Sequence, residues 1–226
     1  MTIDPLSDAK VVDSWEHNAT PWTSAVRENR IESRSLVTNQ AIIDAVMSRS
    51  PSTVLDIGCG EGWLVRALAE LGVSGVGVDA VPALIECAAR TGGGDFRVMS
   101  YEQIAKGDLD VRVNSAVANF SLIGKEAVDD LIAAVPKLLA PGGSFIIQTL
   151  HPRTTTGDHP YQDGWRTGSW TGFSSDFSDP APWYFRTMET WTELIQKTGC
   201  FALEVRDPLH PETKKPVSVV FIADFA

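Results

Sequence analysis

Two carboxylates bracket a glycine-rich turn near residue 60, in the stretch V-L-D-I-G-C-G-E-G-W. Asp56 and Glu61 flank Gly58 and Gly60, and Gly62 follows. Because glycine has no Cβ, such a turn lets a ligand approach the backbone closely. Carboxylates beside the turn would repel a diphosphate but would attract a ligand that carries positive charge. The residue types therefore indicate a site for a cationic small molecule.

A dinucleotide site has a different spacing at the same place. Its G-x-G-x-x-G pattern sets a diphosphate on the helix N-terminus. Here the third glycine, Gly62, comes one residue early, and Trp63 occupies the position where the dinucleotide pattern has its last glycine. Downstream, V-G-V-D ends in Asp79, about 20 residues past the turn, where an acid hydrogen-bonds ribose hydroxyls. S-adenosylmethionine combines a ribose with a sulfonium and an ammonium, so it fits both features.

Three motifs carry a resemblance to a known family. They are V-L-D-I-G-C-G-E-G, the G-V-D-A that contains Asp79 and Ala80, and the L-L-A-P-G-G of residues 138–143. In this order and spacing they resemble the class I S-adenosylmethionine-dependent methyltransferases of the small-molecule type, similar to the ubiquinone/menaquinone-biosynthesis enzymes. The resemblance covers residues 30–150 best. It implies an α/β Rossmann-like methyltransferase fold, with a mostly parallel seven-stranded sheet, an antiparallel terminal strand and an aromatic-rich cap.

The resemblance also implies which residues bind the cofactor, S-adenosylmethionine. They are Arg34, Asp56, Gly58, Cys59, Gly60, Trp63, Asp79, Ala80, Ser100, Tyr101, Asn119 and Phe120. In such enzymes an arginine before the first strand pairs with the methionine carboxylate, which is the role expected of Arg34. Ser100 and Tyr101 would contact the adenine, although the family has an acid near Ser100 that this pattern lacks. Cys59 is interpreted as a small spacer in the turn and not as a nucleophile.

The chain of 226 residues is expected to form one domain. Residues 1–50 would form a helical lid, 51–150 the cofactor-binding core, 151–186 a cap insertion, and 187–226 a terminal helix and strand pair. Five of the seven tryptophans lie in the leader or the insertion, which favours an aromatic cap over the cofactor.

The apolar periodicity predicts the elements of this domain. Helices are expected at 31–48, 64–71, 84–91, 128–138 and 190–197, and strands at 54–57, 76–79, 96–99, 111–117, 144–150, 201–205 and 217–225.

His151 is the candidate general base, because it directly follows the fifth predicted strand. The alternative is that its imidazole only holds the turn between Leu150 and Pro152. The candidate substrate contacts are Trp15, Tyr161, Trp183, Tyr184 and Arg186, and for these the alternative is packing within the cap. A metal site is not expected, because the histidines lack ligand spacing and the cysteines form no C-x-x-C.

Composition and charge limit the function further. A net charge of −10 disfavours a nucleic-acid substrate, which requires a basic surface. No signal peptide and no apolar run of about 20 residues is found, so no membrane partner is expected. Three unpatterned cysteines indicate reduced thiols in the cytoplasm. The oligomeric state stays open.

Three functions compete at this point. The leading one is methyl transfer from S-adenosylmethionine to an oxygen or nitrogen of a small-molecule metabolite. The first alternative is a nicotinamide-dependent oxidoreductase on a related fold. The second is a non-catalytic partner protein that binds S-adenosylmethionine.

Overall fold

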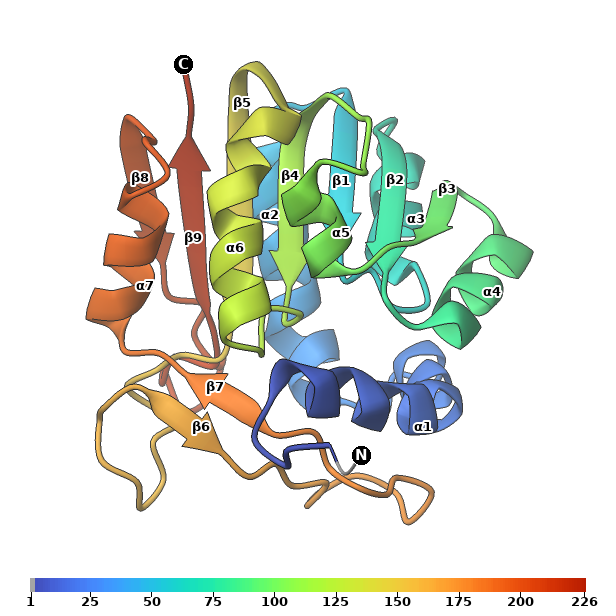
Figure 1. The fold of residues 1–226 in the computed structure, drawn as a ribbon, viewed down its shortest axis with the longest axis vertical. Coiled ribbons are helices and arrows are strands. Elements are labelled where there is room, and N and C mark those ends of the chain that lie inside the picture. Colours follow the sequence, from blue (N-terminus) through green and yellow to red (C-terminus); the bar gives the residue numbers. More distant parts are fainter. Residues whose placement is uncertain (1–2) are drawn as a thin grey trace.

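A seven-stranded sheet runs through the computed structural model, which describes residues 3–226 (Figure 1). Its order is β3-β2-β1-β4-β5-β9-β8. Neighbouring strands are parallel from β3 to β5, and β9 is antiparallel to both β5 and β8. The predicted Rossmann-like fold is thus confirmed. The strands are β1 (Thr53–Ile57), β2 (Ser74–Asp79), β3 (Asp95–Val98), β4 (Val113–Asn119), β5 (Leu139–Thr149), β8 (Ala202–Arg206) and β9 (Val219–Asp224).

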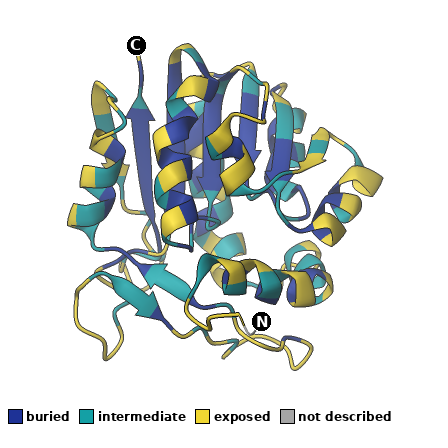
Figure 2. Cartoon of the chain, viewed as in Figure 1, coloured by how far each residue is buried: buried dark blue, intermediate teal, exposed yellow. Residues whose placement is uncertain are grey.

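Helices cover both faces of this sheet and bury its central strands (Figures 1 and 2). Apolar side chains of α5, α6 and α7 pack on one face, and those of α2 and α3 pack on the other. Strands buried on both faces are expected to be almost continuously apolar, as β1, β4 and β9 are. The helices are α1 (Asp8–Arg27), α2 (Asn39–Met47), α3 (Trp63–Glu70), α4 (Pro82–Thr91), α5 (Tyr101–Lys106), α6 (Glu126–Ala134) and α7 (Met188–Gln196).

Two predicted elements differ from those observed. The helix predicted at 31–48 contains a π-helical segment, Arg34–Thr38, before α2 begins. Strand β5 begins at Leu139 rather than at Ser144, so the P-G-G turn lies within it. There the register of β4 and β5 shifts, because Leu139 pairs with Val113 but Ser144 already pairs with Ser115. The extra residues form a bulge at Gly142, whose φ is +75°.

The predicted lid is the 20-residue helix α1, which lies across the carboxyl ends of the parallel strands (Figure 1). Ser7 caps it by accepting a hydrogen bond from the Lys10 amide. Trp15 and Trp22 hold it against Val81 and Leu84 at the start of α4. None of the helices in the described residues is long and apolar enough to span a bilayer.

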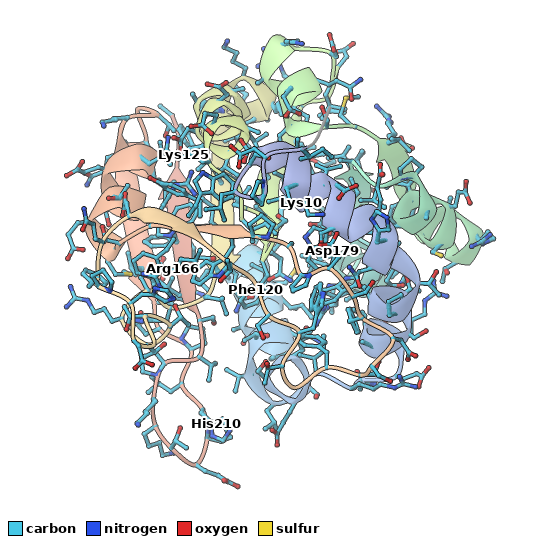
Figure 3. All side chains as sticks on the ribbon, turned by 60° about the horizontal axis from the view of Figure 1, so that its bottom comes forward. Lys10, Phe120, Lys125, Arg166, Asp179 and His210 are labelled. Carbon is cyan, nitrogen blue, oxygen red and sulfur yellow. The ribbon has the colours of Figure 1, made fainter. Side chains whose placement is uncertain are left out.

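The cap contains two short strands that the sequence did not predict, β6 (Gly164–Arg166) and β7 (Trp183–Phe185). Hydrogen bonds tie the loop between them to α1. The Asn18 amide group donates to the Ser178 carbonyl at 2.7 Å and accepts from the Ser178 amide at 3.0 Å. Lys10 pairs with Asp179, and these two side chains lie next to each other in Figure 3. Lid and cap therefore close this end of the sheet together.

Asp8 fastens the other end of the lid to the core. Its carboxylate accepts hydrogen bonds from the backbone amides of Lys125, at 2.6 Å, and Ala127, at 2.9 Å. These amides lie at the start of α6, where no residue of the helix itself can accept from them. Asp8 is therefore an N-cap supplied from a distant part of the chain.

Replacing Asp8 with Ala should lower the free energy of unfolding by about 1 kcal/mol, because the α6 amides lose their acceptor. Urea denaturation measures this loss. Glu16→Ala is the matched control, since Glu16 lies exposed on the same helix, and it should change the stability little. Equal stability of the two variants would contradict the capping role.

Candidate functional site

The glycine turn between β1 and α3 forms the floor of the site. Gly58 has a φ of +75°, and its amide donates to the Val78 carbonyl at 2.8 Å. A Cβ on Gly58 would lie 2.3 Å from the Cβ of Ser121 and 2.8 Å from the Tyr101 hydroxyl oxygen. Around Gly60 there is more room, since a Cβ there would meet only Trp22 Nε1 at 3.5 Å. Only glycine fits at Gly58, and the turn leaves its backbone open at Gly60.

Asp79, at the end of β2, is the acid that faces the site. Its carboxylate accepts hydrogen bonds from the amides of Gly60 and Val81, both at 2.9 Å. Burial raises the pKa of Asp79, although those amide bonds oppose the shift. The side chain links the turn to the second strand and presents its carboxylate to the cavity.

The two acids that bracket the turn have other partners. Glu61 is 1% exposed and is paired by Arg66, at 2.6 Å, and by Arg27, at 2.9 Å. Asp56 is buried within β1, and burial together with the nearby Asp79 raises its pKa to about 7. Neither side chain lines either of the two cavities at the turn, so the structure does not bring them into direct contact with a ligand there.

Two cavities meet at the turn, one of about 130 Å³ and one of about 390 Å³. We call them the small and the large chamber. Gly58, Gly60, Asn119 and Phe120 line both, as do Trp15, Trp22 and Ile123. The chambers are therefore two parts of one cleft beneath the lid and the cap, at the carboxyl ends of the strands.

Besides the four predicted cofactor residues that line both chambers, the small chamber contains four more: Asp79, Ala80, Ser100 and Tyr101. The Tyr101 hydroxyl donates to the Ser121 carbonyl at 3.0 Å, and Ser100 caps α5. Residues not singled out from the sequence complete the wall, namely Asp8, Val11, Val12, Val81, Leu84, Glu102, Ser121, Gly124, Ala127 and Val128. The sequence pattern indicated no acid near Ser100. Glu102 is such an acid, because it lies two residues after Ser100 and lines the same chamber.

The large chamber contains Arg34, Cys59 and Trp63. The Arg34 guanidinium lies over the ring of Trp63, 4.8 Å from its centroid, and burial lowers the pKa of this arginine to about 10. One of its nitrogens, Nη2, is buried without a hydrogen-bond partner, and so is the Asn119 side-chain oxygen. The cleft therefore holds an unused donor and an unused acceptor.

Phe120 occupies an uncommon backbone conformation between the chambers. Its φ is +54°, a region that residues other than glycine rarely adopt, and its amide donates to the Gln148 carbonyl at 2.7 Å. Figure 3 shows Phe120 near the middle of this end of the molecule. The conformation turns the chain sharply after β4, so that Asn119 and Ser121 both reach the cleft.

The predicted substrate residues divide into two groups. Trp15, Trp183, Tyr184 and Arg186 line the large chamber. Tyr161 does not, because its hydroxyl donates to Glu189 at 2.8 Å and accepts from the Met188 amide at the start of α7. This pairing indicates a structural role.

His151, the candidate base, also lies outside both chambers. It is buried, and its Nε2 is 3.4 Å from a carboxylate oxygen of Asp207.

One group of possible metal ligands, Asp13, His17 and Asp179, is found among residues 3–226. Lys10 pairs with both of those carboxylates, so it takes the place of a cation there.

Arg66→Met should destabilise the fold by about 2 kcal/mol. Breaking a buried pair costs about 3–5 kcal/mol, but Arg27 remains beside Glu61 and reduces the loss. Urea denaturation tests this value against Arg90→Met, which removes an exposed arginine from α4. Equal stability losses in the two variants would show that Glu61 does not need its second partner.

Asp56→Asn should change how stability depends on pH. The pKa of Asp56 is raised from 3.8 to about 7, so the folded protein holds a proton that the unfolded chain has released. This group's contribution to the free energy of unfolding is therefore full below about pH 4 and is lost as the pH rises through 7. Relative to the unchanged protein, Asp56→Asn should gain stability as the pH rises from about 4 to about 7 and should keep that gain at higher pH. Exposed Asp110→Asn is the control, and parallel curves for Asp56→Asn and the unchanged protein would contradict the shift.

Comparison with known proteins identifies the family to which this chain is similar. Residues 27–205 match the sequence profile of a family described as a methyltransferase domain. The ubiquinone biosynthesis O-methyltransferase of Xanthomonas oryzae pv. oryzae is 32% identical over 120 residues, which are 48% of this chain and 47% of that protein. The chain thus matches about half the length of this curated relative.

Solved structures share the fold at lower identity. The 1,6-didemethyltoxoflavin-N1-methyltransferase of Burkholderia thailandensis has a TM-score of 0.65 and 18% identity, with 100% of this chain and 93% of that chain covered. An S-adenosylmethionine-dependent methyltransferase from Mesorhizobium loti has a TM-score of 0.58 and 21% identity, covering 76% and 90%. Since the profile spans most of the sequence, the chain belongs to the methyltransferase-domain family, and the predicted resemblance to class I S-adenosylmethionine-dependent methyltransferases is confirmed.

Proposed function

We propose that this protein transfers the methyl group of S-adenosylmethionine to an oxygen or nitrogen of a small, partly aromatic or apolar metabolite. The observation that carries this proposal is the pair of chambers that meet at the glycine turn. One has an acid and hydroxyl groups, as a nucleoside requires, and the other is walled by tryptophans. A donor whose adenosine lies in the small chamber and whose methionine portion reaches Arg34 would meet an acceptor in the large chamber beside Phe120.

The unused polar groups of the cleft fit the cofactor. Arg34 Nη2 is a free donor that matches a carboxylate, and the Asn119 side-chain oxygen is a free acceptor that matches an ammonium. Asp79 is placed to accept from ribose hydroxyls, and Glu102 and Ser100 lie where the adenine edge would be. The open backbone at Gly60 leaves room for the ligand on the floor of the cleft.

When bound, S-adenosylmethionine supplies a methyl carbon already activated by the sulfonium. The chain's own residues then need to align two partners and exclude water. Trp15 and Trp22 on α1 and Trp183 in the cap form that enclosure, and the Asn18–Ser178 hydrogen bonds keep it closed. The position of His151 outside both chambers does not support the base role considered for it.

The relatives support a small-molecule acceptor. By their names, the Xanthomonas relative is an O-methyltransferase of ubiquinone biosynthesis, and the Burkholderia protein is an N-methyltransferase whose structure contains 1,6-didemethyltoxoflavin. The net charge of −10 also favours such an acceptor over a nucleic acid. A nicotinamide oxidoreductase and a non-catalytic partner protein find no support in these comparisons.

Arg34→Met should weaken binding of S-adenosylhomocysteine about tenfold or more, since a hydrogen bond to a charged group contributes about 1.5–3 kcal/mol. It should leave binding of 5′-methylthioadenosine, which lacks the amino-acid portion, almost unchanged. Calorimetry measures both ligands. Arg30→Met is the matched control, because Arg30 is exposed and pairs with Glu28. If the unchanged protein bound neither ligand, the proposed function would be refuted.

A further inference from the structure

Resting on the proposed function, we infer that the acceptor binds with its nucleophilic atom already unprotonated, as a flat, uncharged or anionic ring compound, and that protonated amines are excluded. The large chamber offers aromatic walls and two arginines. It offers no side chain suited to remove a proton.

Arginines supply all the formal charge on the wall of the large chamber. Its lining within residues 3–226 contains Arg34 and Arg186 but no aspartate, glutamate, histidine or lysine. Arg186 is fully engaged, since it donates to the carbonyls of Gly124 and Lys125 and to the Asp129 carboxylate. Its charge is thereby neutralised by Asp129, and the lining holds no carboxylate that could pair with a cationic acceptor beside the sulfonium.

Each carboxylate of the small chamber either accepts hydrogen bonds from backbone amides or lies at the edge of the chamber. Asp8 accepts from two amides of α6, and Asp79 accepts from the amides of Gly60 and Val81. Glu102 is exposed, beside the residues assigned to the adenine. None of the three lines the large chamber, so none is placed to accept a proton from the acceptor.

The remaining candidates for a base are weak. Burial raises the pKa of the Cys59 thiol well above its ordinary value, so the thiol stays protonated. Tyr184 presents a phenol, which is a poor proton acceptor near neutral pH. Lys125 and Arg186 both lie over its ring, with Lys125 Nζ 5.5 Å from the centroid. His151 lies outside the chamber.

The walls define the shape and charge of the acceptor. Its aromatic lining consists of Trp15, Trp22, Trp63, Phe120, Trp170, Phe173, Trp183, Tyr184 and Trp191. Such walls favour a flat ring by stacking and edge contacts. A cationic amine would be repelled by the sulfonium, and the lining offers no carboxylate to offset that repulsion or the cost of burying the amine's charge.

The transfer step then needs no proton acceptor. The lone pair of the acceptor nitrogen or oxygen forms the new bond to the methyl carbon. The bond between that carbon and sulfur breaks, and its two electrons stay on sulfur. A ring nitrogen would become a cation, and a carboxylate would become a neutral ester. No proton moves during either step.

Two matched pairs of probes test the inference. Isoquinoline has an unprotonated ring nitrogen at neutral pH, whereas 1,2,3,4-tetrahydroisoquinoline has nearly the same skeleton and is a protonated amine. Similarly, 2-naphthoate is an anion, whereas 2-naphthalenemethanol is an un-ionised alcohol. Each is titrated calorimetrically into the full chain saturated with S-adenosylhomocysteine, and then assayed with S-adenosylmethionine for methylated product by mass spectrometry.

Isoquinoline should bind about tenfold or more tightly than the protonated amine, a difference of about 1.4 kcal/mol. The amine should gain affinity as the pH is raised through its own pKa. If methylated product forms, isoquinoline and 2-naphthoate should be methylated faster than 2-naphthalenemethanol. His151→Gln and Tyr184→Phe should leave the pH dependence of amine binding unaltered, because the group that titrates is on the acceptor and not on the protein.

Binding of the protonated amine as tightly as isoquinoline would overturn the inference, and so would a pH profile that either variant shifts. In both cases S-adenosylhomocysteine would still bind, and the proposed function would stand. Failure of S-adenosylhomocysteine to bind at all would instead refute the proposed function and this inference with it.

Trp183→Leu should weaken isoquinoline binding, whereas Phe201→Ala, at a side chain 72% exposed, should not.

Discussion

The contact between the ends of β1 and β4 is the constraint on which the rest of the site depends. The strand order reverses between these two neighbours, since the chain goes on from β1 to β2 on one side and from β4 to β5 on the other. The loops after the two strands therefore diverge and leave a crevice between them. The Ser121 hydroxyl donates to the Ile57 carbonyl at 2.6 Å and lies against Gly58, so the two loops also touch at its floor. A side chain at Gly58 would separate them.

Charge in the cleft is distributed by what each carboxylate contacts. Glu61 is neutralised by two arginines and supports the fold, Asp56 is buried within the sheet, and Asp79 faces the cavity. The two acids beside the turn suggested a cationic ligand, and the family supports that ligand, but neither of these two acids lines the cleft. Arg34 adds the opposite charge at the far end of the cleft. A ligand with a ribose at one end and a carboxylate at the other matches this order.

Lid and cap act as one cover because they share hydrogen bonds. Helix α1 contributes Trp15 and Trp22 to the cleft wall, and the cap contributes Trp170 and Trp183. Trp15 meets Trp22 and Trp170 edge-on, with centroids 5.0 and 5.7 Å apart. Since the same rings hold the cover together and line the chamber, the shape of the acceptor is coupled to the closure of the lid.

The sequence by itself determined the fold class, the order of the strands along the chain, the glycine turn and Asp79, because these depend on local spacing and apolar periodicity. Eleven of the twelve predicted cofactor residues line the cleft for this reason, all except Asp56. Only the tertiary structure decided which polar side chains face the ligand. Glu61 and His151 look equally suited to chemistry in the sequence, but Arg27 and Arg66 pair with Glu61, and Asp207 lies beside His151. Arg27 lies 34 residues from Glu61, and Asp207 lies more than fifty from His151, so local spacing does not predict these two contacts. Only folding brings these side chains within a few ångströms of each other.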